Sequence, residues 1–252
     1  MKINIKKSFG FIFLLIAIIS MIDLIYIFYE YKKDRDMYSE LVKSAVYNES
    51  DKKIEFDNSL KVSNSLEKIN INEDKLKSIN SDYKFWIRIE NTKINYPVVQ
   101  GKDNDYYTIY DFERKKRKAA SIFIDCRNDM QKDKNIIIYG HNMHDGSMFH
   151  DLIKFKDKNF FENNKTIEIT INNKKYIYEI FSVYVTSSSD NYLITAFSSP
   201  KDFMEYISKA KSKSLFKNNL EITSDDKIIT LSTCSYEFND ARTVVHAKLI
   251  KQ

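Results

Sequence analysis

The segment Lys165–Thr186, KTIEITINNKKYIYEIFSVYVT, decides the fold class of this chain. Apolar and polar side chains alternate on both sides of Asn172 and Asn173, and a period of two is typical of half-buried strands. Two such runs separated by two turn-forming residues predict a β-hairpin. The segment therefore predicts an antiparallel hairpin that needs further strands as partners.

Six further strand candidates surround the hairpin and bring the total to eight. They lie at residues 83–90, 94–100, 120–126 and 135–140 before it, and at 227–233 and 242–250 after it. A helix is predicted from Ser199 and Pro200, because both residues favour helix N-termini and apolar residues follow at helical spacing. Many short strands with few helices between them predict a mainly β fold, as a largely antiparallel barrel or sandwich.

The N-terminal segment predicts a membrane anchor. Residues 9–29 read FGFIFLLIAIISMIDLIYIFY and contain one charged residue, Asp23. About 20 helical residues at ~1.5 Å each cross a hydrocarbon core of ~30 Å. The run is longer than the apolar part of a secretory signal peptide and lacks a small-x-small cleavage site, so we expect it to be retained. Lysines at positions 2, 6 and 7 favour a cytoplasmic N-terminus, although basic residues at 32, 33 and 35 weaken that preference.

These features predict four regions of the chain. Residues 1–8 form a cytoplasmic tail, and residues 9–29 form a single-pass transmembrane anchor in the cell membrane. Residues 30–80 lack Gly and Pro and carry apolar residues at loosely helical spacing, so they predict a helical stalk and N-terminal helices. Residues 81–252 form the main domain, which we expect on the extracellular side.

The composition excludes several classes of function. The 252 residues include 40 basic and 35 acidic residues, and this net charge of +5 does not point to a nucleic-acid partner. The four glycines cannot form the GxGxxG or Walker loops of dinucleotide- and NTP-binding enzymes. The two cysteines, Cys126 and Cys234, provide neither a CxxC zinc site nor a disulfide framework.

Three reactive residues each stand at the end of a predicted strand. Cys234 ends IITLSTC, His141 follows NIIIYG, and Arg242 begins RTVVHAKLI. Strand ends present side chains to clefts. A thiolate is a nucleophile, a histidine transfers protons, and a guanidinium stabilises an oxyanion. Each residue alone is more often structural, but their joint placement predicts a nucleophilic catalytic site.

These motifs resemble those of the sortases, the membrane-anchored cysteine transpeptidases of Gram-positive bacteria. The resemblance rests on TLSTC, on Arg242 eight positions after Cys234, and on YGHN upstream, and it covers roughly residues 80–252. The segments DYKFWIRIENTKINYPVVQ and NMHDGSMFHDLIKF look like those of class B sortases. The resemblance implies an eight-stranded sortase-type β-barrel with N-terminal helices, and a helix-containing insertion at about residues 190–219, before the Cys234 strand.

The resemblance also implies roles for the three strand-end residues. Cys234 is the nucleophile, His141 the general acid/base, and Arg242 the oxyanion-stabilising or substrate-positioning cation. The implied reaction cleaves a C-terminal sorting signal of secreted proteins after Thr and leaves a thioester on Cys234. An amine of a cell-wall peptidoglycan precursor then accepts the acyl group, and no step requires a cofactor or metal.

The sequence offers weaker candidates around this site. Ser232 and Thr233 precede the nucleophile on alternating faces, so one of them should line the substrate groove, and Tyr192 in the insertion is a further candidate for substrate binding. The run HNMHDGSMFH matches no zinc-site spacing, so we expect no metal there. Cys126 is interpreted as a buried or spare thiol, and His246 as a structural residue.

Alternatives to this hypothesis belong to two functional classes. L,D-transpeptidases also use Cys, His and Arg, but their SHGC-type motif is absent here, and papain-like enzymes place the cysteine on a helix ahead of the histidine. The other class is a non-catalytic, membrane-tethered extracellular binding module in which Cys234 is structural. Selective alkylation of Cys234 over Cys126 would distinguish an enzyme from such a module.

Overall fold

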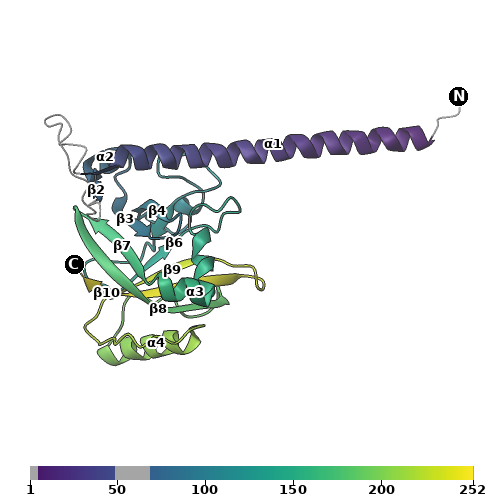
Figure 1. The fold of residues 1–252 in the computed structure, drawn as a ribbon. Coiled ribbons are helices and arrows are strands. Elements are labelled where there is room, and N and C mark those ends of the chain that lie inside the picture. The colour runs from purple at the N-terminus through teal and green to yellow at the C-terminus, as the bar shows by residue number, and fades with distance from the viewer. Residues whose placement is uncertain (1–4, 49–68, 252) are drawn as a thin grey trace, which may run out of the picture.

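The computed structural model describes residues 5–48 and 69–251 (Figure 1). Its centre is a closed barrel with the ring order β10-β8-β7-β3-β4-β5-β6-β9. The eight strands of the ring are β3 (Tyr83–Ile89), β4 (Asn95–Val99), β5 (Ile122–Ile124), β6 (Asn135–Tyr139), β7 (Thr166–Ile171), β8 (Lys174–Ser187), β9 (Ile228–Cys234) and β10 (Ala241–Lys251). Each overlaps a strand candidate, and closure of the sheet decides between a barrel and a sandwich.

The β7–β8 hairpin has the predicted two-residue turn. Ile171 pairs with Lys174, and Asn172 and Asn173 between them adopt φ angles of 50° and 58°. Asparagine tolerates this left-handed region, which a type I′ turn requires at both central residues. The turn residues therefore set the register of the β7–β8 pairing.

The pairing of β6 with β9 matters most for the functional site. This pair and β4–β5 are parallel, whereas the remaining neighbours in the ring are antiparallel. The C-terminal ends of parallel strands lie at the same edge of a sheet. Tyr139 is level with Ser232, so the chain segments that leave β6 and β9 meet at one end of the barrel.

Helix α4 (Pro200–Lys213) lies in the insertion between β8 and β9, as predicted. The Ser199 side chain accepts a hydrogen bond of 3.2 Å from the backbone N–H of Asp202 and caps the helix. The apolar face of α4 shares a buried cluster with Phe181 of β8 and Val244 of β10. Figure 1 shows α4 and α1 on opposite sides of the barrel.

Two helical segments between β6 and β7 were not among the predicted elements. They are the 3-10 helix η3 (His150–Lys156) and α3 (Lys158–Asn163), and they bury Leu152, Phe155 and Phe161. Helices this short are not stable alone, and their few apolar residues give no clear periodic pattern. Packing on the barrel therefore explains why they form and why the sequence pattern missed them.

The predicted anchor and the start of the predicted stalk form one continuous helix, α1 (Ile5–Ala45). Its apolar part projects beyond the barrel with exposed side chains, and by length and composition it can cross a membrane (Figure 1). Its last turns pack on the barrel instead, where the buried residues are Met37, Tyr38, Leu41 and Ala45. One helix thus carries two surfaces suited to two different environments.

After α1 the structure follows the helical prediction for residues 30–80 only in part. Strands β1 (Val46–Asn48) and β2 (Ile69–Ile71) form a small antiparallel sheet, and α2 (Glu73–Ile79) follows. The apolar residues of β2 have helical spacing, but β2 pairs with β1 and its Ile71 N–H donates a 3.2 Å hydrogen bond to Asn173 Oδ1. These contacts favour the strand over the helix. The part of the prediction at residues 49–68 lies outside the described residues.

Candidate active site

Cys234 and Arg242 lie opposite one another on neighbouring strands. Cys234 is the last residue of β9 and pairs with Arg242 of β10 in antiparallel register. Directly opposed residues have Cβ atoms about 4.5–5.5 Å apart and side chains on the same face of the sheet. Both residues are partly exposed. The register therefore brings a thiol and a guanidinium together at the end of the barrel.

His141 reaches the same end of the barrel from β6. The Gly140 N–H donates a 3.3 Å hydrogen bond to the Ser232 carbonyl, which extends the parallel pairing beyond Tyr139. The Thr233 hydroxyl donates to the Gly140 carbonyl at 2.8 Å and supports the same segment. Since β9 lies between β6 and β10 in the ring, Cys234 is flanked by His141 on one side and Arg242 on the other.

Gly140 permits the close approach of the His141 segment to the barrel. A Cβ atom at this position would lie 2.7 Å from Cγ of Phe149 and 2.8 Å from its Cδ2. These distances are far below van der Waals contact in a close-packed interior. The Phe149 N–H also donates to the His141 carbonyl at 2.9 Å, so any side chain at position 140 would disturb the histidine.

A backbone contact determines where the His141 ring carries its hydrogen. Nε2 lies 2.8 Å from the carbonyl oxygen of Thr108. A carbonyl oxygen only accepts hydrogen bonds, so Nε2 must be protonated. In the neutral ring Nδ1 then holds the lone pair and is the atom that can take up a proton.

One cavity of about 280 Å³ gathers every site residue predicted from the sequence. Cys234, His141 and Arg242 line it together with Ser232, Thr233 and Tyr192. Strand alternation predicts that only one of Ser232 and Thr233 lines the groove, whereas both do so here. The Ser232 hydroxyl bonds the Tyr192 hydroxyl and the Thr233 hydroxyl bonds the Gly140 carbonyl, so each contacts a different segment that lines the same cavity at the end of β9.

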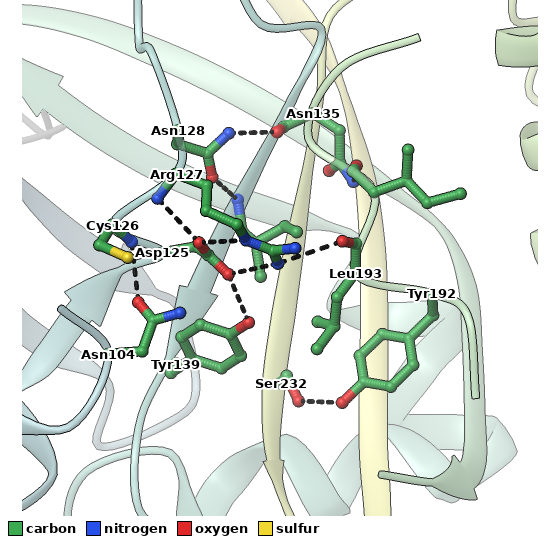
Figure 2. A network of polar contacts seen from close by, with 12 residues as sticks. Asn104, Asp125, Cys126, Arg127, Asn128, Asn135, Tyr139, Tyr192, Leu193 and Ser232 are labelled. Carbon is green, nitrogen blue, oxygen red and sulfur yellow. Dashed lines mark hydrogen bonds and ion pairs between the residues drawn. The ribbon is translucent and has the colours of Figure 1, made fainter. Parts of the chain in front are cut away.

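Tyr192 belongs to the insertion that precedes α4. It is 3% exposed, and its hydroxyl shares a 3.0 Å hydrogen bond with Ser232 Oγ (Figure 2). Its carbonyl accepts a 2.7 Å hydrogen bond from the Tyr206 hydroxyl of α4. Burial raises the pKa of Tyr192, so the hydroxyl stays protonated. Tyr192 thus connects the insertion to β9 close to Cys234.

Asn142 is a site residue that the sequence analysis did not single out. Its Nδ2 donates to the Cys234 carbonyl at 2.8 Å, and its Oδ1 lies 2.8 Å from Nδ1 of His150. It therefore holds the backbone of the residue at the centre of the site. Its place directly after His141 in YGHN is the signal that would have identified it.

Other parts of the cavity wall come from segments that no local motif marks. Asn104 and Thr108 lie in the connection between β4 and β5, Phe123 lies on β5, and Leu193 follows Tyr192 in the insertion. These segments are far from Cys234 in the sequence. Only the barrel topology brings them together.

The remaining histidines and the second cysteine do not line the cavity. His150 contacts Asn142, and the His144 ring stacks on Tyr236 with 5.9 Å between centroids. Across residues 5–48 and 69–251, no group of three or more His, Cys, Asp or Glu side chains is placed to hold a metal ion. Cys126 is a partly buried free thiol, and His246 is fully buried.

Comparisons with known proteins show which sequences and structures this chain is similar to. A family profile described as the sortase domain matches residues 87–250. Sortase B of Listeria monocytogenes serovar 1/2a is 43% identical over 178 residues, which cover 69% of this chain and 72% of that protein. The X-ray structure of Clostridium perfringens sortase B has a TM-score of 0.70 and 46% identity, over 71% of this chain and 100% of that one. A Staphylococcus aureus sortase B–substrate complex has a TM-score of 0.67 and 40% identity, over 71% of this chain and 84% of that one.

Proposed function

The chain belongs to the sortase family of cysteine transpeptidases, and from this premise we propose that Cys234, His141 and Arg242 carry out its reaction. The proposed substrate is the C-terminal sorting signal of a secreted protein, bound as an extended peptide in the cavity. The observation that supports this assignment best is the β9–β10 register, which sets Cys234 opposite Arg242, with His141 on the other flank of β9.

The first half of the proposed reaction forms a thioester. The Cys234 thiolate attacks the carbonyl carbon of the Thr residue, and the C=O electron pair moves to the oxygen, where the Arg242 guanidinium stabilises the negative charge. The intermediate then collapses, the peptide C–N bond breaks, and protonated His141 gives a proton to the departing amine. Because Nε2 faces Thr108, Nδ1 is the atom that transfers this proton.

The second half transfers the acyl group to an amine. His141, now neutral, accepts a proton at Nδ1 as the amine nitrogen attacks the thioester carbonyl. Collapse of the second intermediate releases the Cys234 thiolate and forms a new amide bond. The proposed acceptor is an amine of a cell-wall peptidoglycan precursor, and the two steps together regenerate the starting ionisation of both residues.

The proposed location follows from α1. Residues 9–29 would cross the cell membrane once, with residues 1–8 in the cytoplasm and the catalytic domain, residues 81–252, outside. The support for this location is the exposed apolar part of α1, which by length and composition can span a membrane. The apolar contacts of Tyr31 and the ion pair of Asp34 with Arg117 belong to the part that would lie outside.

The proposal is tested with the full chain in detergent, as wild type, Cys234→Ala and Cys126→Ala. Each protein is incubated with a panel of pentapeptides that contain an internal Thr, with and without an amine acceptor. The masses of the peptide products and of the intact protein are then measured by mass spectrometry. We expect cleavage after Thr and an acyl adduct on Cys234, both lost in Cys234→Ala and kept in Cys126→Ala. Cleavage that persists in Cys234→Ala would exclude the proposed nucleophile.

Alkylation with a methanethiosulfonate reagent addresses the binding-module alternative. A catalytic Cys234 should react much faster than Cys126, because only the thiolate is nucleophilic and only Cys234 lies between the guanidinium and the imidazole. Equal inertness of both thiols would favour a structural Cys234.

A further inference from the structure

A charged cluster behind the cavity joins the barrel to the insertion. Asp125 follows β5 and is fully buried, and the Arg127 guanidinium contacts both of its carboxylate oxygens, with Nε 2.9 Å from Oδ1 and Nη2 2.8 Å from Oδ2. The Tyr139 hydroxyl, at the end of β6, donates to Oδ2 at 2.8 Å. Figure 2 shows this cluster beside Tyr192 and Leu193.

The same guanidinium reaches the insertion. Arg127 Nη2 donates a 3.2 Å hydrogen bond to the backbone carbonyl of Leu193 (Figure 2). Leu193 and Tyr192 line the cavity, and so does Tyr139. Arg127 itself does not line the cavity, and its side chain is 54% exposed. It therefore contacts the cavity wall from behind.

The insertion backbone depends on side chains at this point. Residues 193–197 have no regular secondary structure. Three successive carbonyls accept hydrogen bonds from side chains: Tyr192 from the Tyr206 hydroxyl at 2.7 Å, Leu193 from Arg127, and Ile194 from Asn135 Nδ2 at 2.8 Å. A segment without a backbone ladder takes its conformation from such contacts. Arg127 supplies the charged contact among them.

The charges of the cluster are stable. Burial alone would raise the pKa of Asp125, but the hydrogen bonds from Arg127 and Tyr139 lower that pKa to about 2. Asp125 is thus ionised at neutral pH and holds the guanidinium through a two-point contact, which restricts its direction more than a single bond would. The Arg127 side chain is partly exposed and nevertheless well oriented.

We propose that Arg127, oriented by Asp125, is a positioning residue that fixes the Tyr192–Leu193 wall and thereby sets the affinity for the peptide substrate. This inference rests on the proposed peptide-binding role of the cavity. Arg127 contacts none of the three reacting side chains, so it acts on binding and not on the chemical step. Its removal should raise KM and leave kcat nearly unchanged, the pattern of lost uniform binding.

The test compares Arg127→Ala with Arg114→Ala in the full chain in detergent. Arg114 also forms a partly exposed Arg–Asp contact, 3.1 Å to Asp82, and does not line the cavity. With the pentapeptide that wild type cleaves fastest, we expect KM to rise about threefold to tenfold in Arg127→Ala, as for a weakened charge-assisted hydrogen bond. We expect no change in Arg114→Ala.

A conservative variant separates geometry from charge. Arg127→Lys keeps a positive charge, but a single ammonium cannot bond both Asp125 oxygens and the Leu193 carbonyl in the same geometry. We expect its KM to fall between wild type and Arg127→Ala. A KM equal to that of wild type in Arg127→Ala, or a loss confined to kcat, would overturn the inference.

Amide hydrogen exchange supplies a readout independent of turnover. Exchange at residues 190–195 should accelerate in Arg127→Ala and not in Arg114→Ala, while alkylation of Cys234 keeps its wild-type rate. Unchanged exchange at these residues would overturn the inference. If wild type cleaves no peptide, the proposed function fails, and exchange alone then decides whether Arg127 positions the insertion.

Discussion

The two walls of the cavity are built in different ways. One wall consists of strand ends: Cys234 and Arg242 are paired through a backbone ladder, and the His141 segment extends the β6–β9 pairing. The other wall is the insertion, where the carbonyls of residues 192–194 are held by side chains. The strand wall carries the proposed chemistry, and the insertion wall carries the proposed recognition.

This difference implies that the strand wall is the rigid part of the cavity and that the insertion wall is the part that can change. Atoms that form and break bonds must be positioned closely, and a backbone ladder changes little when one side chain is altered. A loop held by side chains can be altered residue by residue without disturbing the barrel. Changes to the strand wall should therefore affect kcat, whereas changes to the insertion wall should affect KM.

The largest effect is expected from the guanidinium of the strand wall. Replacing Arg242 by Lys keeps a charge but loses the planar donor group, and loss of an oxyanion donor costs about 10²- to 10³-fold in rate. We expect kcat of peptide cleavage to fall by that amount in the full chain, with KM changed little. The control is Arg88→Lys on β3, which should leave kcat unaffected. A strong rise in KM at normal kcat would instead make Arg242 a binding residue.

A second change tests the packing beneath His141. In Gly140→Ala the new methyl group would meet the Phe149 ring, and overpacking of this kind costs about 1–3 kcal/mol. We expect lower stability and a clear loss of kcat, because the His141 segment is displaced. The measurements are thermal unfolding and peptide cleavage.

The double variant Gly140→Ala/Phe149→Leu is the matched control for this clash. The smaller leucine should restore part of the lost activity relative to Gly140→Ala. Full activity in Gly140→Ala alone would show that the close approach to Phe149 is unimportant for the histidine.

A third prediction concerns the support behind the insertion wall. His246 bonds Thr230 through Nδ1 at 2.8 Å and Tyr184 through Nε2 at 2.9 Å, and Thr230 bonds Asn135, which holds the Ile194 carbonyl. Burial lowers the pKa of His246 to about 3. Between pH 6.5 and pH 3 this histidine is protonated in the unfolded chain but neutral in the folded chain. Its contribution to the free energy of unfolding therefore decreases as the pH falls from 6.5 to 3, and it is constant above pH 6.5.

Relative to pH 7, protonation of His246 should lower the free energy of unfolding by about 2 kcal/mol at pH 5, since each pKa unit corresponds to about 1.4 kcal/mol. Urea unfolding at pH 7 and pH 5, followed by the fluorescence of Trp86, measures it. His246→Gln should be less stable at pH 7 but should lack this part of the pH dependence. The same decrease in both proteins would assign it to other groups.

The smallest effect is expected from a hydrogen bond that joins the two walls. Tyr192→Phe and Ser232→Ala each remove one partner of the 3.0 Å contact between the hydroxyls. Each should raise KM a few-fold, and the double variant should add little, because the shared bond is worth about 1 kcal/mol. Fully additive effects would mean that the two hydroxyls act separately, and a fall in kcat would contradict the division between the walls.

The strand wall was easier to predict from the sequence than the insertion wall. Cys234, His141 and Arg242 each adjoin a run of apolar residues whose length and β-branched content indicate a strand, so their position at strand ends follows from local pattern. The eight strands were predicted for the same reason, and α4 was predicted from its Ser199–Pro200 start and the helical spacing of its apolar residues. The pairing of Cys234 with Arg242, however, depends on the strand register, which local pattern does not give.

The insertion wall depends on contacts between distant segments. Arg127 and Leu193 are 66 positions apart, and Asn135 and Ile194 are 59 apart. A single arginine after a strand has no signature that distinguishes it from a solvated charge. The strand β2 escaped prediction for a related reason, since its partner β1, and not its own spacing, determines its conformation.

The continuity of α1 has a consequence for how the enzyme meets its substrates. Contacts with the barrel begin at the end of the apolar part itself: Lys118 Nζ lies 5.9 Å from the ring centroid of Tyr26 and 5.7 Å from that of Tyr31, which also packs against the barrel core. With the apolar part of α1 as the proposed anchor, the barrel is held at one height above the lipid and diffuses only in two dimensions. The effective concentration of a reaction partner at the cavity then depends on its own height above the membrane. Partners presented at the height of the cavity meet it often, and partners held at other heights rarely do.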